Sequence, residues 1–165
     1  KTFGELGSGP GQFNLVHNIV ADDDGWIYVA DRENHRIQVF NTDGKYETQW
    51  NNLHRPCGLF MSRGKCPVCI VGELGPGLLV NRKYQNLGPR LSVLDNSGNL
   101  ITRLGGANGP GFGLGQFLAP HGLSVDTKGS IYVGEVSYTN WPYSFGDKPK
   151  PKYLKTLQKL ERVLN

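Results

Sequence analysis

The sequence has little charge, little cysteine and no long hydrophobic run. Charged residues make up 19% of the 165 residues and hydrophobic residues 38%, which is enough for a packed core and excludes a disordered chain. No apolar stretch approaches the roughly 20 residues that span a bilayer, and the N-terminus lacks the charged-then-apolar layout of a signal peptide. A soluble chain without a membrane partner is therefore expected, and the sequence leaves its localisation open.

Three cysteines are too few for a disulfide-built scaffold of this length, and they cannot all pair within one chain. Cys66 and Cys69 have the CxxC spacing of a zinc knuckle or a redox pair. No second CxxC and no nearby histidine completes a four-ligand set, so neither role is favoured. We interpret Cys69 as a small hydrophobic strand residue.

The net charge of +4 is concentrated at one end of the chain. Residues 148–165 hold six cations and one acid, whereas residues 1–147 hold twelve cations and thirteen acids. The body is therefore nearly neutral, and we interpret the basic tail as solvated. Nucleic acid is not expected as a partner on this ground.

Glycine and proline are abundant, with 23 and 10 residues, and they separate short apolar segments that repeat. Segments of five or six residues rich in Val, Ile, Leu and Tyr alternate with Asp-Gly, Ser-Gly or Lys-Gly, dipeptides that supply the positive φ of hairpin turns. The pattern predicts an all-β chain of consecutive antiparallel hairpins in about three four-stranded units. A single partial domain covers residues 1–165, with blades at 14–51, 55–105 and 118–165 and a strand remnant plus linker at 1–13.

Units of about 40 residues with this pattern are typical of a β-propeller. Before the first and third units stands a shared string, Gly-Pro-Gly-Gln-Phe at 9–13 and Gly-Leu-Gly-Gln-Phe at 113–117, in which the phenylalanine is expected to anchor the crossing between blades. With Ala-Asp-Arg-Glu-Asn-His-Arg-Ile-Gln-Val-Phe at 30–40 and Pro-His-Gly at 120–122, these units resemble NHL repeats. The strings are similar to the peptidyl-α-hydroxyglycine amidating lyase (peptidylamidoglycolate lyase) branch of that class.

The resemblance implies a ring of six blades, of which this chain supplies about half. Half a ring leaves sheet edges and apolar blade faces uncovered. Two alternatives follow: the chain is a piece of a longer protein, or a homodimer completes the ring, with the N-terminal strand (2–6) of one copy pairing with the last blade of the other.

His17 and His121 occupy the same repeat position, at the start of the innermost strand of units one and three. Cys57 occupies it in unit two. Innermost strands line a propeller's central channel, and neutral imidazoles bind zinc and similar divalent ions. The resemblance implies that His17 and His121 are two of three metal-ligating histidines, the third lying in blades outside this chain; zinc is the expected ion. The alternative is that each imidazole only bonds a neighbouring carbonyl.

Arg32 follows the second strand of unit one, and the resemblance implies a catalytic arginine in this string, one that holds a substrate carboxylate or alkoxide. An ion pair with Glu33 or Glu73 is an equally weighted alternative. Asp31, Glu73 and Glu135 share one repeat position and predict either capping of loop amides, which we favour, or a calcium site at the rim. Tyr138 is a candidate substrate contact near the mouth.

The resemblance implies a metal-dependent lyase-like enzyme acting on a small-molecule or peptide substrate, with a divalent metal at the centre. The sequence departs from the lyase pattern at Gly122, where that family has an acid tied to its structural calcium. The alternative is a non-catalytic NHL module that binds protein or RNA, for which Trp141, Tyr143 and Phe145 beside the lysine-rich tail are the candidate surface.

Overall fold

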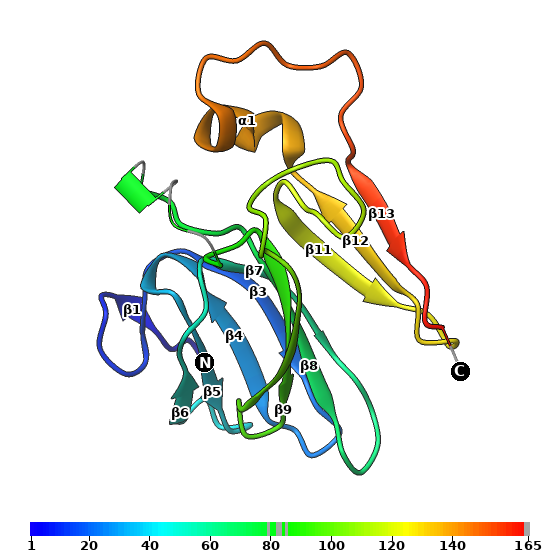
Figure 1. Cartoon of the computed structure of the whole chain (residues 1–165). Coiled ribbons are helices and arrows are strands. Elements are labelled where there is room, and N and C mark those ends of the chain that lie inside the picture. The colour runs from blue at the N-terminus through cyan, green and yellow to red at the C-terminus, as the bar shows by residue number, and fades with distance from the viewer. Residues whose placement is uncertain (79, 82–83, 85, 164–165) are drawn as a thin grey trace.

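Three antiparallel sheets stand side by side and fan out from their first strands (Figure 1). The computed structural model describes every residue except 79, 82–83, 85 and 164–165. Its thirteen short strands confirm the predicted all-β fold. The end of the predicted last blade and part of the predicted second blade, between residues 74 and 89, lie outside the described residues.

Each of the first two sheets has four strands in sequence order. The first sheet consists of β3 (Val16–Ala21), β4 (Ile27–Asp31), β5 (Arg36–Phe40) and β6 (Tyr46–Trp50), with the 3-10 turn η1 (Arg32–Asn34) between β4 and β5. The second consists of β7 (Pro56–Met61), β8 (Val68–Glu73), β9 (Arg90–Asp95) and β10 (Leu100–Gly105).

The third sheet has three strands, β11 (Pro120–Val125), β12 (Ile131–Glu135) and β13 (Leu157–Leu160). Lys159, in β13, and Glu161, which follows the strand, form an ion pair at the surface. The chain between β12 and β13 contains α1 (Ser137–Phe145), which lies beyond the start of β11 (Figure 1).

The predicted hairpin glycines all adopt the left-handed conformation. Gly25, Gly44, Gly98 and Gly129 have φ between 76° and 88°. In all four of these turns the side-chain oxygen of an asparagine or aspartate also accepts amides of its own turn, as Asp22 does from Asp24 and Trp26. Local turn chemistry therefore fixes where each strand ends.

Three apolar clusters are present among the described residues, and the smallest contains Cys57, Leu74 and Ala119. Between the first and second sheets lie Tyr28, Ile37, Trp50, Leu59 and Cys69 with their neighbours. Between the second and third lie Ile70, Leu91, Phe117 and Val133. Cys69 is fully buried, as its interpretation as a strand hydrophobe requires, and burial raises the pKa of its thiol to about 12.

The N-terminal segment folds back on the first sheet instead of extending it. β1 (Glu5–Leu6) pairs in parallel with β2 (Gln12–Phe13), and the rings of Phe3 and Phe13 lie 5.6 and 5.8 Å from that of Phe40. The segment therefore covers part of the first sheet, while Leu6 itself is 85% exposed.

Candidate metal centre

The first strands of the three sheets, β3, β7 and β11, begin at the same end of the molecule, and β7 contacts both of the others (Figure 1). His17, Cys57 and His121 are each the second residue of one of these strands. Each falls where the pairing with the neighbouring strand shifts register, at a β-bulge. A bulge turns a side chain out of the normal alternation, so the same irregularity in three sheets aims these three side chains toward one point.

The three side chains form one cluster. The rings of His17 and His121 lie 4.3 Å apart between centroids and meet edge to face at 87°. The ligand atoms of His17, Cys57 and His121 all lie within 4.8 Å of one another. Tetrahedral zinc with these ligands needs separations of roughly 3.3–3.8 Å, so small side-chain adjustments are enough.

Close approach of the second and third sheets depends on a glycine beside the cluster. A Cβ on Gly58 would lie 2.7 Å from the carbonyl oxygen of His121 and 3.0 Å from Cγ of Leu123. At Gly72 the corresponding atom would meet Pro120 at 3.3 Å. The absence of a side chain at residue 58 thus lets β11 come close enough to β7 for His121 to reach the cluster.

Burial sets the protonation states of the cluster. It lowers the pKa of both His17 and His121, and in His121 the neighbouring imidazole and Arg32 act in the same direction. Burial raises the pKa of the Cys57 thiol to about 11, against the opposite influence of Arg32 and Arg55. Neutral imidazoles are the metal-binding form, whereas Cys57 would release its proton when an ion binds.

A charged group lies next to the cluster. Arg32 donates from Nε to Glu33 at 2.7 Å, and Arg55 donates to the same carboxylate oxygen at 3.0 and 3.1 Å. These two guanidiniums lower the pKa of Glu33. The structure thus forms the Arg32–Glu33 pair, one of the two ion pairs weighed from the sequence, and both arginines remain near enough to influence Cys57.

The other ion pair weighed for Arg32 does not form, because Glu73 binds Arg90 at 2.9 Å instead. Glu73 also accepts the backbone N–H of His54, while Asp31 accepts that of Asn14 and Glu135 those of Leu118 and Ala119. All three acids are buried. They cap the loop that precedes each first strand, which leaves few oxygens for a calcium ion.

Tyr138 lies on α1 and is 66% exposed, with the Lys150 ammonium 3.6 Å from the centre of its ring. No contact with the cluster is present among the described residues. The aromatic surface proposed for RNA is largely internal: Trp141 is buried, packs on Phe145 and donates its indole N–H to the carbonyl of Lys148. Tyr143 remains half exposed.

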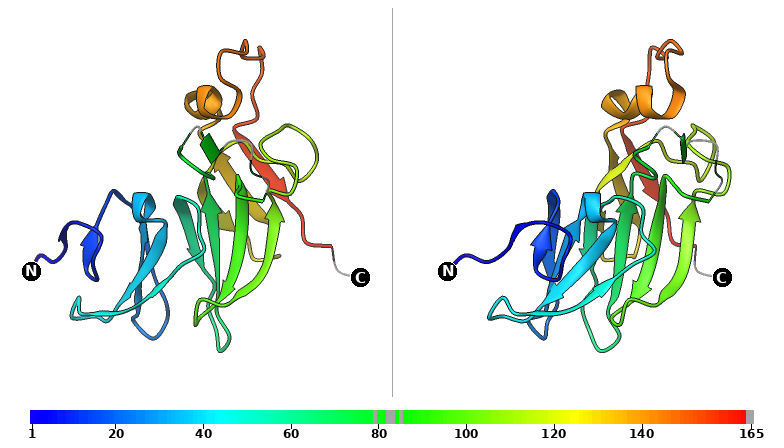
Figure 2. Two further views of the ribbon diagram at one scale, coloured as in Figure 1. Left: turned by 60° about the vertical axis from the view of Figure 1, so that its left-hand side comes forward. Right: turned by 90° about the vertical axis from the view of Figure 1, so that its left-hand side faces the viewer.

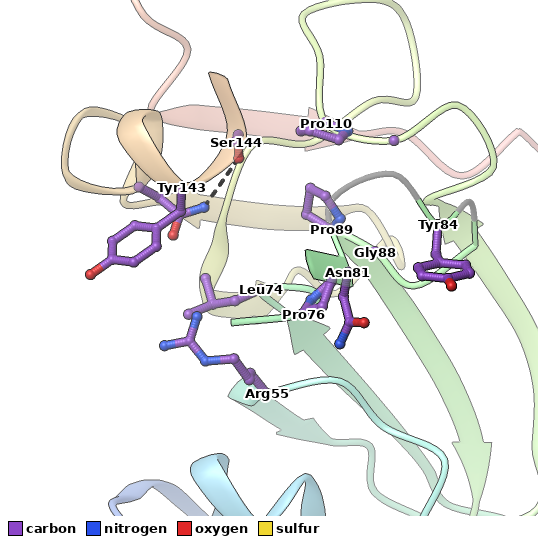
Figure 3. A pocket seen from close by; sticks show the side chains of 12 residues that line it. Arg55, Leu74, Pro76, Asn81, Tyr84, Gly88, Pro89, Pro110, Tyr143 and Ser144 are labelled. Atoms are coloured by element: carbon purple, nitrogen blue, oxygen red, sulfur yellow. Dashed lines mark hydrogen bonds between the residues drawn. The ribbon is translucent and has the colours of Figure 1, made fainter. Parts of the chain in front are cut away.

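A pocket lies between the loop before β7 and α1 (Figure 3). Arg55 and Tyr143 lie on one side of it, and Tyr84 lies on the other. Because Arg55 also binds Glu33, this pocket is linked to the charged group beside the histidines.

Two histidines to which the sequence assigned no chemistry lie together in loops. The rings of His35 and His54 are 6.0 Å apart. Their pairing could not be read from the repeat, because they stand at different positions of their units. Cys57 was placed at the shared position, but it was not assigned as a ligand.

The model of the NHL repeat family matches residues 13–40, the segment that contains β3, β4 and β5. The chain contains an NHL repeat. NHL repeat-containing protein 3 of Homo sapiens is 36% identical over 139 residues, which cover 81% of this chain and 36% of that protein. Protein brain tumor of Drosophila melanogaster is 29% identical over 135 residues, 81% of this chain and 12% of its own length. The chain thus spans about a third or less of the length of these NHL relatives.

Solved structures support the NHL-type propeller fold. A protein of unknown function from Bacteroides caccae superposes with a TM-score of 0.58 at 13% identity, covering 88% of this chain and 46% of that one. A streptogramin B lyase gives 0.50 at 13% identity, covering 94% and 43%. At such identities the likeness concerns the fold alone. None of the helical segments in the described part of the chain has the length and hydrophobicity that crossing a membrane requires.

Proposed function

We propose that this NHL-repeat chain is part of a metal-dependent enzyme whose ion is held by His17, Cys57 and His121. The observation that carries the proposal is the convergence of three ligand atoms, from three separate sheets, to within 4.8 Å. It changes the ligand set expected from the amidating-lyase resemblance, because Cys57 of this chain takes the place of a third histidine. Metal binding by His17 and His121 stays a prediction.

Two imidazoles and a thiolate suit zinc better than calcium, which prefers oxygen ligands. Three protein ligands leave one position for substrate, as in catalytic zinc sites. An ion bound there would supply Lewis-acid polarisation of a substrate oxygen. Calcium is not proposed for Asp31, Glu73 and Glu135, since their oxygens already accept protein hydrogen bonds.

The proposed reaction is the carbon–nitrogen cleavage that the lyase resemblance implies, on a peptide ending in an α-hydroxyglycine. The hydroxyl gives its proton to a base, its O–H electron pair forms a carbonyl, and the C–N bond breaks. The nitrogen takes a proton to become an amide, and glyoxylate leaves. No oxidant or reductant is required.

Arg32 is the residue of this chain proposed to orient the substrate carboxylate. Glu33 holds Arg32 and Arg55 in place, and its lowered pKa makes it a poor proton acceptor. The proposal therefore assigns the base to a group other than Glu33. Tyr138 stays a candidate contact for a longer substrate.

The test is metal stoichiometry of the purified chain after exposure to zinc, followed by cobalt substitution. We expect one ion per chain, lost in His17→Ala, His121→Ala and Cys57→Ser, and a thiolate-to-cobalt charge-transfer band absent from Cys57→Ser. His35→Ala and His54→Ala are matched controls that keep the ion, and circular dichroism checks folding. Zinc retained by all three cluster variants, or never bound, would contradict the proposal.

The reaction is tested separately, by glyoxylate release from an α-hydroxyglycine peptide. A chain that binds zinc but releases no glyoxylate, alone or with the remainder of a longer polypeptide, would keep the metal site and refute the lyase assignment.

A non-catalytic binding module is the second candidate, and it is favoured by similarity to other NHL-repeat proteins. An E3 ubiquitin-protein ligase, TRIM32 of Homo sapiens, is 48% identical over 44 residues, which cover 27% of this chain and 7% of its own length. This candidate predicts binding of protein or RNA without metal. Burial of Trp141 weakens the case for RNA, because base stacking needs an open ring face.

The proposal also requires the central channel to be enclosed by more sheets than these three. Either further blades of a longer polypeptide or a second copy of this chain would enclose it. β13 is the last strand of a three-stranded sheet, and pairing of residues 2–6 of a second copy with it would require β1 of that copy to separate from β2.

A further inference from the structure

A separate cavity lies between the first two sheets, among residues of the β3–β4 turn, β4, β6 and the β9–β10 turn. These two turns lie at the lower end of both views in Figure 2. It has a volume of about 350 Å³ and is lined by aromatic residues Trp26, Tyr28 and Trp50 and by acids Asp22, Asp24 and Glu47. We call it the acidic–aromatic pocket. The β9–β10 turn closes one side with Ser97.

The charged residues that line the described part of this pocket are all acidic. No lysine, arginine or histidine is among its described lining residues. Asp22 is committed to its own turn and to the Tyr28 hydroxyl, which donates to it at 2.7 Å. The carboxylates of Asp24 and Glu47 form no hydrogen bond or ion pair within the described part of the chain, so two negative charges remain without a partner at the rim.

Trp50 supplies a second and independent feature. Its side chain belongs to the core and is only 4% exposed, yet its indole N–H has no hydrogen-bond acceptor among the described residues. Every fully enclosed side-chain nitrogen or oxygen in that part of the chain has a partner. The Trp50 N–H is therefore not fully enclosed, and it belongs to a ring that lines this cavity, so a ligand there could supply its acceptor.

Comparison of the three units distinguishes pocket residues that build the turn from those found only in the first unit. In the third sheet Tyr132 donates to Asp126, as Tyr28 does to Asp22, so this bond builds the turn. Thr48 likewise recurs as Thr102 in the second unit, whereas the two unpaired acids and the two tryptophans of the pocket do not recur. Lys128 and Ser130 stand where the first unit has Asp24 and Trp26, and Ile101 and Leu104 of the second unit match Glu47 and Trp50.

We propose that the acidic–aromatic pocket binds an alkylammonium group. An ammonium beside the partly exposed Trp26 gains cation–π attraction from the face of that ring, and Asp24 and Glu47 supply the opposite charge. The Trp50 N–H would bond an oxygen carried near the ammonium. A lysine side chain of a protein partner, methylated or not, and a free small ammonium compound share this chemistry.

The three tryptophans make a direct test, because their indole N–H signals are resolved by nuclear magnetic resonance in the full chain. Tetramethylammonium, Nα-acetyl-lysine amide and its Nε-trimethyl form are titrated in turn, with the neutral tert-butyl analogue of the trimethyl form as a charge control. We expect the Trp26 and Trp50 signals to shift with the ammonium probes. Trp141, whose N–H is bonded to Lys148, is the internal control and stays in place.

The probes distinguish the two sources. Tighter binding of the lysine amides than of tetramethylammonium indicates a protein side chain, and the reverse order indicates a free ammonium compound. Binding of the neutral analogue with equal affinity, or shifts caused by calcium and by none of the ammonium probes, would overturn the proposal.

Variants test the roles of the residues. Asp24→Asn combined with Glu47→Gln should weaken binding about tenfold, and Trp26→Ser, which introduces the residue of the third unit, should weaken it by a similar factor. Asp43→Asn, in the turn between β5 and β6 and outside the pocket, is the matched control with unchanged affinity. Unchanged affinity in both pocket variants, with folding intact, would refute the assignment.

Discussion

The cluster of His17, Cys57 and His121 shows which properties of single residues the repeat predicts and which it does not. Equivalent positions in three units were visible in the sequence, and in the structure the rings of the two histidines lie 4.3 Å apart. The bulges that turn these side chains inward were not visible, because they depend on register between strands. For that reason a thiol at the same position was not recognised as a potential third ligand.

His54 gives a prediction for pH dependence. Burial, and secondarily Arg90, lowers its pKa in the folded chain, so the unfolded chain takes up the proton first as pH falls below about 6.5. The free energy of unfolding should therefore decrease below that pH. Replacing His54 by Asn should make the decrease smaller, measured by urea unfolding at about pH 5.5 and pH 8.

At about pH 8 the imidazole is neutral in both states, so that measurement is the reference for the substitution itself. An equal decrease in the two proteins between the two pH values would contradict this role of His54.

At the scale of strands and helices, turn chemistry made the sheets predictable. Asp-Gly, Ser-Gly and Lys-Gly mark hairpins because few other residues accept their backbone angles. The helix Ser137–Phe145 was not predicted, and it contains Pro142. It is held by contacts distant in sequence, with Trp141 and Phe145 packing on Phe112, and such contacts leave no periodic signal.

Gly58 offers a test of how β7 and β11 meet. Gly58→Ala should cost about 1–3 kcal/mol of unfolding free energy, because the added methyl group would strike the backbone of His121. Zinc affinity should fall as well, since His121 moves away from Cys57. Gly122→Ala is the matched control, because its Cβ would meet nothing within 4 Å; equal effects of the two substitutions would exclude this explanation.

The buried acid–arginine pairs give a second test at this scale. Glu73 and Arg90 are almost fully buried and bonded to each other, and Glu73 also caps the loop before β7. Glu73→Gln leaves the Arg90 charge without its counterion, and we expect a loss of about 3–5 kcal/mol in urea unfolding.

Glu161→Gln, which removes the exposed partner of Lys159, should cost about 0–1 kcal/mol. Losses of similar size in these two variants would show that the buried pair is not a special support of the sheet.

At the scale of the whole molecule, the outer sheets leave apolar side chains uncovered. Leu6 and Leu157 are 85% and 70% exposed near the two ends of the stack. If a second copy closes the ring, sedimentation should show a concentration-dependent dimer, and Leu157→Lys should shift it to monomer. Leu114→Lys, at a fully exposed loop position, should leave the dimer intact. A monomer at every concentration would instead favour closure by further blades.

The positions of His17, Cys57 and His121 at the starts of three first strands have one more consequence. Because each is carried by a different sheet, a slight rotation of one sheet against the next changes the separation of the nitrogen and sulfur atoms directly. The distances among these three ligand atoms therefore depend on how the three sheets are aligned. A spectroscopically active metal ion bound there would therefore detect a displacement of one sheet, caused by the loops or the C-terminal tail, before any strand unfolds.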